Sequence, residues 1–242
     1  MTTLSGRGNN MKISAEILIE DRSGAIIAAS LIDQEFKILE NDLGGKKDFE
    51  YELHYRPHRG VGKIPLNWEE PLRASASSLL ELLPAKCRAY SRSLDYKRDI
   101  IIVCFDSDFH EPEELYNGVN KVFSYYLNEF QCIIGIAQEE LEAWLLGDKE
   151  AIEEAYPNCD RNVLDAYVQD SVCGTWETLC RAIEGEKAED IIESDYKITG
   201  RYKSEWAEHI SLHLDCRRNA SPSYIKFRQE LTQAVNRLKN KS

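Results

Sequence analysis

The first part of the chain alternates short apolar runs with longer stretches in which hydrophobic residues recur every three or four positions. Short runs of this kind are typical of strands, and the longer spacing is typical of amphipathic helices. The expected strands cover 12–19, 49–55, 99–105 and 131–136, and the expected helices cover 25–40, 70–94, 112–129 and 138–155. The run at 99–105 is uninterrupted after Asp99, as expected when helices cover both faces of a parallel strand. The pattern predicts an α/β fold with a mainly parallel sheet flanked by helices.

Beyond Pro157 the hydrophobic spacing is helical only. The last helix is expected to begin at Ser221 and Pro222, an N-cap residue followed by proline at the first helical position. Its apolar stripe consists of Tyr224, Phe227, Leu231, Ala234 and Leu238. We therefore expect an α/β core at 12–156 and a helical C-terminal appendage at 157–242.

The residues before Met11 are polar and offer nothing to bury. We expect 1–11 to form a mobile leader, with Met11 as an alternative start of translation. No apolar run approaches the roughly 18 residues that span a bilayer, and no secretory signal precedes the first strand. The 7 cysteines never form a C-x-x-C pair, which favours reduced thiols in the cytoplasm.

The charge balance bears on possible partners. With 42 acidic and 30 basic residues, the net charge is -12, which repels polyanions over the molecule as a whole. A protein of this charge needs a local basic surface, metal ions or a partner to handle nucleic acid.

Acidic residues follow two of the expected strands. Glu20 comes directly after the first strand, and Asp106 and Asp108 follow the third. Because the carboxyl ends of parallel strands meet at one edge of a sheet, these carboxylates are expected to converge there. An all-oxygen set suits Mg²⁺ or Mn²⁺ better than zinc. The alternative is that Asp106 and Ser107 only cap the following turn.

A further acidic segment, Glu140 to Asp148, follows the fourth expected strand. Glu140 lies near the same sheet edge and would complete the metal site. For Glu142 the favoured interpretation is a solvated helix face. Trp144 is expected in the core.

A basic loop follows the second strand. Arg56, His58, Arg59 and Lys63 share it with two glycines, so backbone amides and cations can approach a phosphate together. We predict that these four residues bind substrate beside the carboxylates. The alternative is an ordinary exposed turn.

The segments Ile17–Glu20 and Ile101–Asp108, a strand ending in Glu and an apolar strand ending in D-x-D, resemble the TOPRIM domain of topoisomerases, bacterial primases and OLD-family nucleases. This resemblance implies a TOPRIM-like fold in which Glu20, Asp106 and Asp108 bind Mg²⁺. It also implies that Glu20 works as a general acid or base.

A narrower resemblance covers residues 12–230 and rests on the order of three motifs, at 56–63, 140–148 and 221–224. They are similar to motifs of small TOPRIM-like proteins encoded beside SMC- or ABC-like ATPases in prokaryotic defence loci. The resemblance implies a nuclease that cleaves DNA or RNA as the effector of an anti-phage system, acting with an ATPase partner.

Two other functions stay open. A non-catalytic subunit could use the same core as a regulatory or scaffold platform for the ATPase. A phosphatase of the haloacid dehalogenase type also has a strand ending in D-x-D, but usually has Thr or Val two residues after the second Asp, where this chain has His110. No G-x-x-x-x-G-K-[ST] phosphate loop occurs, so the chain is not itself a P-loop ATPase.

Overall fold

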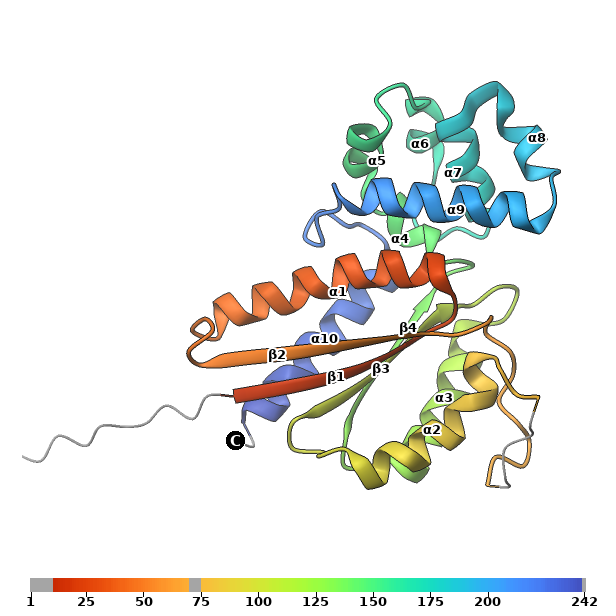
Figure 1. Cartoon of the computed structure of the whole chain (residues 1–242). Helices are drawn as coiled ribbons and strands as arrows, with labels where there is room; N and C mark the ends of the chain where they lie inside the picture. Colours follow the sequence, from red (N-terminus) through yellow and green to blue (C-terminus); the bar gives the residue numbers. More distant parts are fainter. Residues whose placement is uncertain (1–10, 70–74, 241–242) are drawn as a thin grey trace, which may run out of the picture.

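The computed structural model describes residues 11–69 and 75–240, and its centre is a four-stranded parallel sheet (Figure 1). The strands are β1 (Met11–Ile19), β2 (Phe49–Pro57), β3 (Asp99–Asp106) and β4 (Gln131–Ala137). Their order across the sheet is β2-β1-β3-β4, and every neighbouring pair is parallel. The predicted α/β fold is confirmed. Met11 is the first residue of β1, and the rest of the expected leader lies outside the described residues.

Strand β3 is covered on both faces of the sheet, which explains its continuous apolar run. Ile100, Ile102 and Cys104 join the hydrophobic cluster on one face of the sheet, while the residues between them join the cluster on the other face. Every residue of β3 except Asp106 is buried. The only position in this strand with access to solvent is therefore the acidic residue at its carboxyl end.

Helices cover both faces of the sheet. Helices α1 (Arg22–Asp42) and α10 (Pro222–Lys239) pack on one face, and α2 (Leu79–Ser93) and α3 (Pro112–Tyr126) pack on the other (Figure 1). The result is a three-layer α/β/α arrangement, in which ligands are expected at the carboxyl ends of the strands.

The remaining helices gather beyond those carboxyl ends (Figure 1). We call residues 142–211 the helical lobe. Its helices are α4 (Glu142–Leu146), α5 (Lys149–Ala155), α6 (Arg161–Ala166), α7 (Thr175–Glu184), α8 (Ala188–Ile192) and α9 (Tyr196–Ser211), with a 3₁₀ turn at Gly185–Lys187. Helix α9 lies along α1, so the lobe rests on the sheet layer beside the strand ends.

Two expected helices differ from the structure. The helix expected at 70–94 begins at Leu79 as α2, because Ser78 and Glu81 form a capping box there; residues 70–74 lie outside the described part. The helix expected at 138–155 is instead α4 and α5, separated at Gly147. Asp148 starts the second helix by accepting a hydrogen bond from the amide of Ala151.

The C-terminal segment belongs partly to the sheet layer. The predicted N-cap is confirmed, since the Ser221 hydroxyl accepts from the amide of Tyr224, and the predicted apolar stripe of α10 is fully buried. That stripe packs on β4 and joins the core on the α1 face. Within the described ranges, no helix has both the length and the hydrophobicity needed to cross a bilayer.

Candidate functional site

Glu20 and Asp106 meet at the carboxyl edge of the two central strands. Glu20 directly follows β1, and its Oε2 accepts a hydrogen bond from the backbone amide of Asp106 at 3.0 Å. Asp106 ends β3, and its Oδ1 accepts from the amide of Leu141 at 2.8 Å. Both side chains are partly buried. The structure thus brings together two of the acidic residues that the sequence predicted for one site.

Asp108 lies in a turn that is tied to the end of β4. Its φ is 48°, a left-handed conformation that Asp tolerates, and its amide donates to the carbonyl of Glu139 at 2.9 Å. The Ser107 hydroxyl accepts from the Glu139 amide at 2.8 Å. The side chains of Asp106 and Ser107 therefore accept hydrogen bonds from the segment after β4, and the carbonyl of Ser107 accepts from the amide of His110 in the turn that follows.

Burial and mutual repulsion make these carboxyls weak acids. Burial raises the pKa of Glu20 to about 7, and the nearby charges of Asp108 and Asp21 add to the effect. Burial also raises the pKa of Asp106 well above its ordinary value, helped by Glu20 and Glu142. Burial raises the pKa of Asp108, against the opposing effects of His110 and Lys203. Each of these groups would ionise more readily beside a cation.

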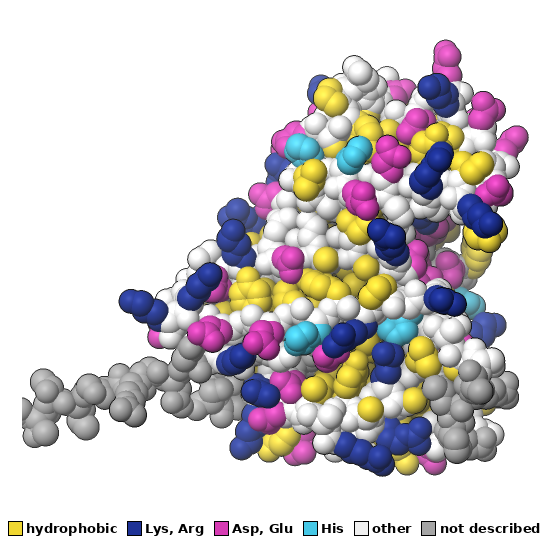
Figure 2. All heavy atoms as spheres, viewed as in Figure 1, with side chains coloured by type: hydrophobic (Ala, Val, Ile, Leu, Met, Phe, Trp, Pro, Cys, Tyr) yellow, Lys and Arg dark blue, Asp and Glu magenta, His cyan; other side chains and the backbone are white. Residues whose placement is uncertain are grey.

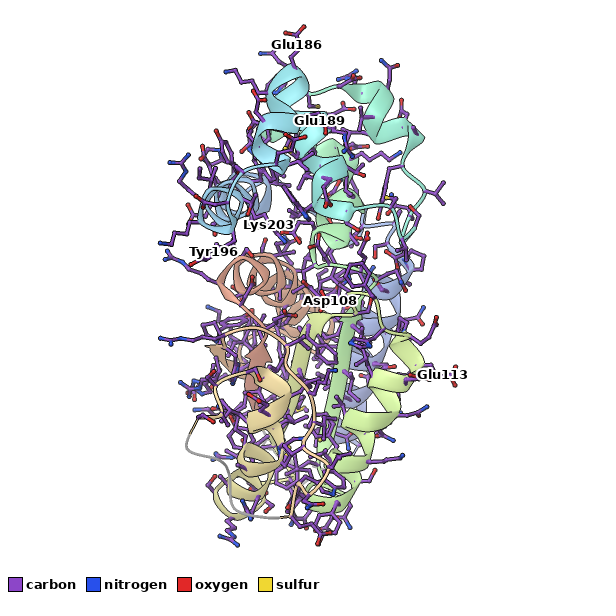
Figure 3. All side chains as sticks on the ribbon, turned by 90° about the vertical axis from the view of Figure 1, so that its right-hand side faces the viewer. Asp108, Glu113, Glu186, Glu189, Tyr196 and Lys203 are labelled. Carbon is purple, nitrogen blue, oxygen red and sulfur yellow. The ribbon has the colours of Figure 1, made fainter. Side chains whose placement is uncertain are left out.

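One lysine of the helical lobe reaches this acidic cluster. Lys203 of α9 places Nζ 3.3 Å from Glu140 Oε1 and 3.2 Å from Glu142 Oε1. Burial alone would lower the pKa of Lys203, but Glu142, Glu140 and Asp106 together outweigh burial and raise it. Figure 3 shows Lys203 on its helix, facing the strand ends. Asp108 lies below it, where the helical lobe meets the sheet layer. The lysine neutralises part of the cluster.

The second oxygen of Glu140 also has a partner, because Oε2 accepts from the amide of Trp176 at 3.1 Å. Burial raises the pKa of Glu140 to about 8, with the charge of Glu142 contributing. Glu142 itself is only 2% exposed, so the expectation that it lies on a solvated helix face is wrong. Trp144 is buried in the core, as predicted.

Glu139 has a structural role that no sequence pattern indicated. Its φ is 63°, and its carboxylate accepts from the amides of Cys173, Gly174 and Thr175 and from the Thr175 hydroxyl. Burial would raise the pKa of Glu139, but these hydrogen bonds lower it. Glu139 thereby joins the end of β4 to the start of α7 and fixes the lobe over the site.

The four basic-loop residues are not equivalent. Arg56 still belongs to β2 and pairs through Nε with Glu16 at 3.1 Å. His58 is half-buried, with Nδ1 3.0 Å from the carbonyl of Ile19, and burial lowers its pKa. Arg59 and Lys63 are exposed. The last two are therefore better placed than Arg56 to contact an external phosphate.

A pocket of about 300 Å³ opens directly beside Asp106. It lies between the basic loop and the first turns of α3, and its polar lining combines Lys63 and His110 with Asp106 and Glu114. The remaining walls are mainly apolar. Lys63 of the loop and Asp106 thus border one space, whereas Glu20, Asp108, Arg56, His58 and Arg59 are not among its lining residues.

Gly62 allows the loop to approach α2 closely. Its φ is 64°, and a Cβ at this position would lie 1.9 Å from the Ser78 hydroxyl. The neighbouring carbonyls of Gly60 and Val61 accept from the amides of Leu79 and Leu80. Only glycine permits this combination of backbone conformation and contact, which fixes one wall of the pocket.

The donor chemistry of the cluster fits a divalent cation. Glu20, Asp106 and Asp108 supply carboxylate oxygens, and because burial raises the pKa of each, a bound cation would favour their ionised forms. Among the residues that the structure describes, no group of three potential ligands is already gathered at one point. Glu20 Oε2 accepts from the amide of Asp106, which leaves the second carboxylate oxygen of Glu20 for a cation.

Comparisons with protein-family models, curated proteins and solved structures gave no match to the chain.

Proposed function

We propose that the chain is a Mg²⁺- or Mn²⁺-dependent TOPRIM-like nuclease that cleaves phosphodiester bonds in DNA or RNA. The observation that carries this proposal is the contact between Glu20 and the amide of Asp106 at the carboxyl edge of adjacent parallel strands. Asp108 follows in the next turn, and Lys63 borders the same pocket as Asp106. Carboxylates for a metal and a cation for phosphate are what such chemistry requires.

Each residue of the site has a role in this proposal. Glu20, Asp106 and Asp108 would hold the metal, which supplies Lewis-acid stabilisation of the charge that develops on the phosphate oxygens. The carboxyl of Glu20, with a pKa of about 7, exchanges a proton near neutral pH and suits a general acid or base. Lys63 and Arg59 bind phosphate. Arg56 and His58 hold the loop in place, Arg56 by its ion pair with Glu16 and His58 by its contact with the carbonyl of Ile19.

The biological setting in the proposal is anti-phage defence in the prokaryotic cytoplasm, with an SMC- or ABC-like ATPase as partner. Support comes from the three sequence motifs and from the cysteines, none of which forms a disulfide among the described residues. The net charge of -12 also favours a protein that acts on nucleic acid only when a partner supplies basic surface.

The test is cleavage of end-labelled DNA and RNA, single- and double-stranded, with Mg²⁺, Mn²⁺ or EDTA, and with and without the ATPase encoded beside the gene. Wild type should cleave at least one substrate in a metal-dependent way, and Asp108→Asn should not. Glu113→Gln is the matched control, because it removes one negative charge from an exposed position on α3. Figure 3 shows Glu113 on the outer side of that helix. Equal activity of wild type and Asp108→Asn would show that the carboxylate of Asp108 takes no part in the reaction.

The second candidate is a non-catalytic platform for the ATPase. Lys203 favours it, because this lysine already neutralises part of the acidic cluster without a metal. In that case Asp108→Asn should keep both ATPase binding and phage protection. Loss of protection with retained ATPase binding would instead support the nuclease.

A further inference from the structure

The outer edge of β2 is open in the described part of the chain. β2 lies at one edge of the sheet and, among the described residues, pairs with β1 only. It spans 9 residues, Phe49–Pro57, which is long for an edge strand. An open edge offers a row of backbone donors and acceptors to another strand.

The available backbone groups can be identified from the hydrogen bonds that β2 makes inward. The amide of His58 donates to Ile19 and the carbonyl of Asp48 accepts from Met11, so even-numbered residues direct their backbone groups toward β1. Odd-numbered residues therefore direct theirs outward. Pro57 has no N–H, and the outward amide of Phe49 already donates to Gly45. The open ladder is thus limited to Tyr51, Leu53 and Tyr55.

We propose that this edge binds a second copy of the chain, with the two β2 strands antiparallel about a two-fold axis through Leu53. Leu53 then faces its own copy, and Tyr51 faces Tyr55 of the other chain. These are the three residues with outward backbone groups, so each would exchange both hydrogen bonds with its counterpart. The inference does not depend on the proposed nuclease activity.

The side chains favour this register. On one face of the joined sheet, the tyrosines and leucines would pair with each other, and on the other face Glu52 would oppose His54 and Glu50 would oppose Arg56. Leu53 faces its own copy, the tyrosines pair with each other, and acidic residues face basic ones, although Glu52 and Arg56 also pair with Lys12 and Glu16 of their own chain. The strand is therefore complementary to its own reverse.

Neighbouring registers are worse. Moving the axis to Glu52 would put two Glu52 carboxylates directly opposite each other, which is destabilising. Moving it to His54 would put Pro57, which has no N–H, opposite Tyr51. The register with the two-fold axis at Leu53 avoids both the repulsion between like charges and the pairing of a tyrosine with a proline that has no N–H.

The surface beside the edge has room for a partner. A groove of about 630 Å³ runs between α1 and β2 and is lined by Tyr51, Leu53 and Tyr55 below Asp33, Gln34 and Lys37. The three strand residues are half-buried in the single chain. Figure 2 shows hydrophobic side chains in a band across this face of the molecule. A second copy would cover that band.

The arrangement also keeps the two acidic sites apart. Because the paired β2 strands run in opposite directions, the carboxyl ends of the two sheets point away from each other. The clusters around Asp106 would lie at opposite ends of the dimer. Two chains that each carry a charge of -12 can then associate with their most acidic regions well separated.

A register-specific disulfide tests the proposal. Leu53→Cys should form an intermolecular disulfide on mild oxidation, because residues in a hydrogen-bonded antiparallel pair have Cα atoms about 5.5 Å apart. Tyr51→Cys should not, because the two copies of residue 51 would be roughly 13 Å apart along the strands. Both variants are made with Cys173→Ser, which removes an exposed native thiol, and that parent must stay uncrosslinked.

Light scattering after size exclusion gives the second readout. Wild type should have twice the mass of one chain, and Leu53→Lys, which places like charges on the axis, should have the mass of one chain with an unchanged circular dichroism spectrum. Leu66→Lys, at a residue that is 98% exposed and outside the sheet, should stay dimeric. A monomeric wild type would overturn the proposal. So would a dimer that crosslinks equally through residues 51 and 53.

Discussion

At the scale of single residues, the site is defined by carboxylates whose pKa values are raised mainly by burial. Glu20 and Asp106 could be predicted from the sequence, because each follows an apolar strand and parallel strands end at one edge. Lys203 and the buried position of Glu142 could not. Lys203 lies in a polar helix far along the chain, and only the packing of α9 beside α1 brings it to the strand ends.

Removing Lys203 should destabilise the fold. Lys203→Met leaves Glu140 and Glu142 without their cationic partner in a buried place, so we expect a loss of roughly 3–5 kcal/mol in the free energy of unfolding. Arg181→Met is the control, because it breaks an exposed pair with Glu189 in the same lobe and should change stability little. Urea denaturation followed by circular dichroism measures both. Equal effects of the two variants would show that Lys203 is an ordinary surface charge.

Stability should also depend on pH in metal-free buffer. The pKa of Glu20 is about 7 in the folded chain against an ordinary 4.5, so the folded state binds this proton more tightly than the unfolded state. The contribution to stability is present below pH 4.5 and is lost as the pH rises to about 7. The melting temperature of Glu20→Gln should therefore fall less than that of wild type between pH 5 and 8. Parallel curves for the two proteins would contradict the raised pKa.

At the scale of elements, the strands and the last helix followed from hydrophobic spacing, whereas the segments around the site did not. The helix expected at 138–155 is interrupted after Gly147, whose carbonyl accepts from the amide of the distant Ala220 and whose missing Cβ leaves room for the side chain of Asn219. The turn before α4 follows the hydrogen bonds of Glu139 to α7. Periodicity reports which face of a helix is buried, but it carries no information on such long-range polar contacts.

The loop that borders the pocket should depend on Gly62. Gly62→Ala introduces a strained φ and a clash with Ser78, whose hydroxyl bonds to Glu81 at the start of α2. Gly45→Ala is a matched control, because Gly45 has a φ of 79° with nothing within 4 Å of an added Cβ. We expect Gly45→Ala to cost about 1–2 kcal/mol from backbone strain. Gly62→Ala should cost about 1 kcal/mol more through the lost helix cap, measured by urea denaturation. Equal costs would show that the contact with Ser78 is unimportant.

At the scale of the whole molecule, the sheet layer and the helical lobe enclose the site from two sides. Glu139 and Lys203 connect them at the strand ends, and α10 returns from the lobe to cover β4. From the sequence, the stripe of α10 is expected to be covered by the α/β core or by a partner, and hydrophobic spacing leaves open which of the two. The stripe predicts burial, and the partner is set by the three-dimensional path of the chain.

A chain that ends at Ala220 should therefore fail to fold cooperatively. It would lack α10, and the buried residues of β4 on that side would face water. We expect aggregation, or broad thermal unfolding with binding of a hydrophobic dye. A soluble fragment that unfolds in one sharp transition would show instead that α10 is dispensable.

The proposed function depends most directly on whether the acidic cluster holds a divalent cation. Isothermal titration of the metal-free protein with Mn²⁺ at neutral pH, where Glu20 begins to ionise, measures this capacity without requiring a substrate or a partner. Wild type and Glu113→Gln should show the same saturable site, and Asp108→Asn should bind Mn²⁺ more weakly by roughly tenfold or more. Equal Mn²⁺ binding by wild type and Asp108→Asn, or no saturable binding by wild type, would contradict a metal site formed by Glu20, Asp106 and Asp108.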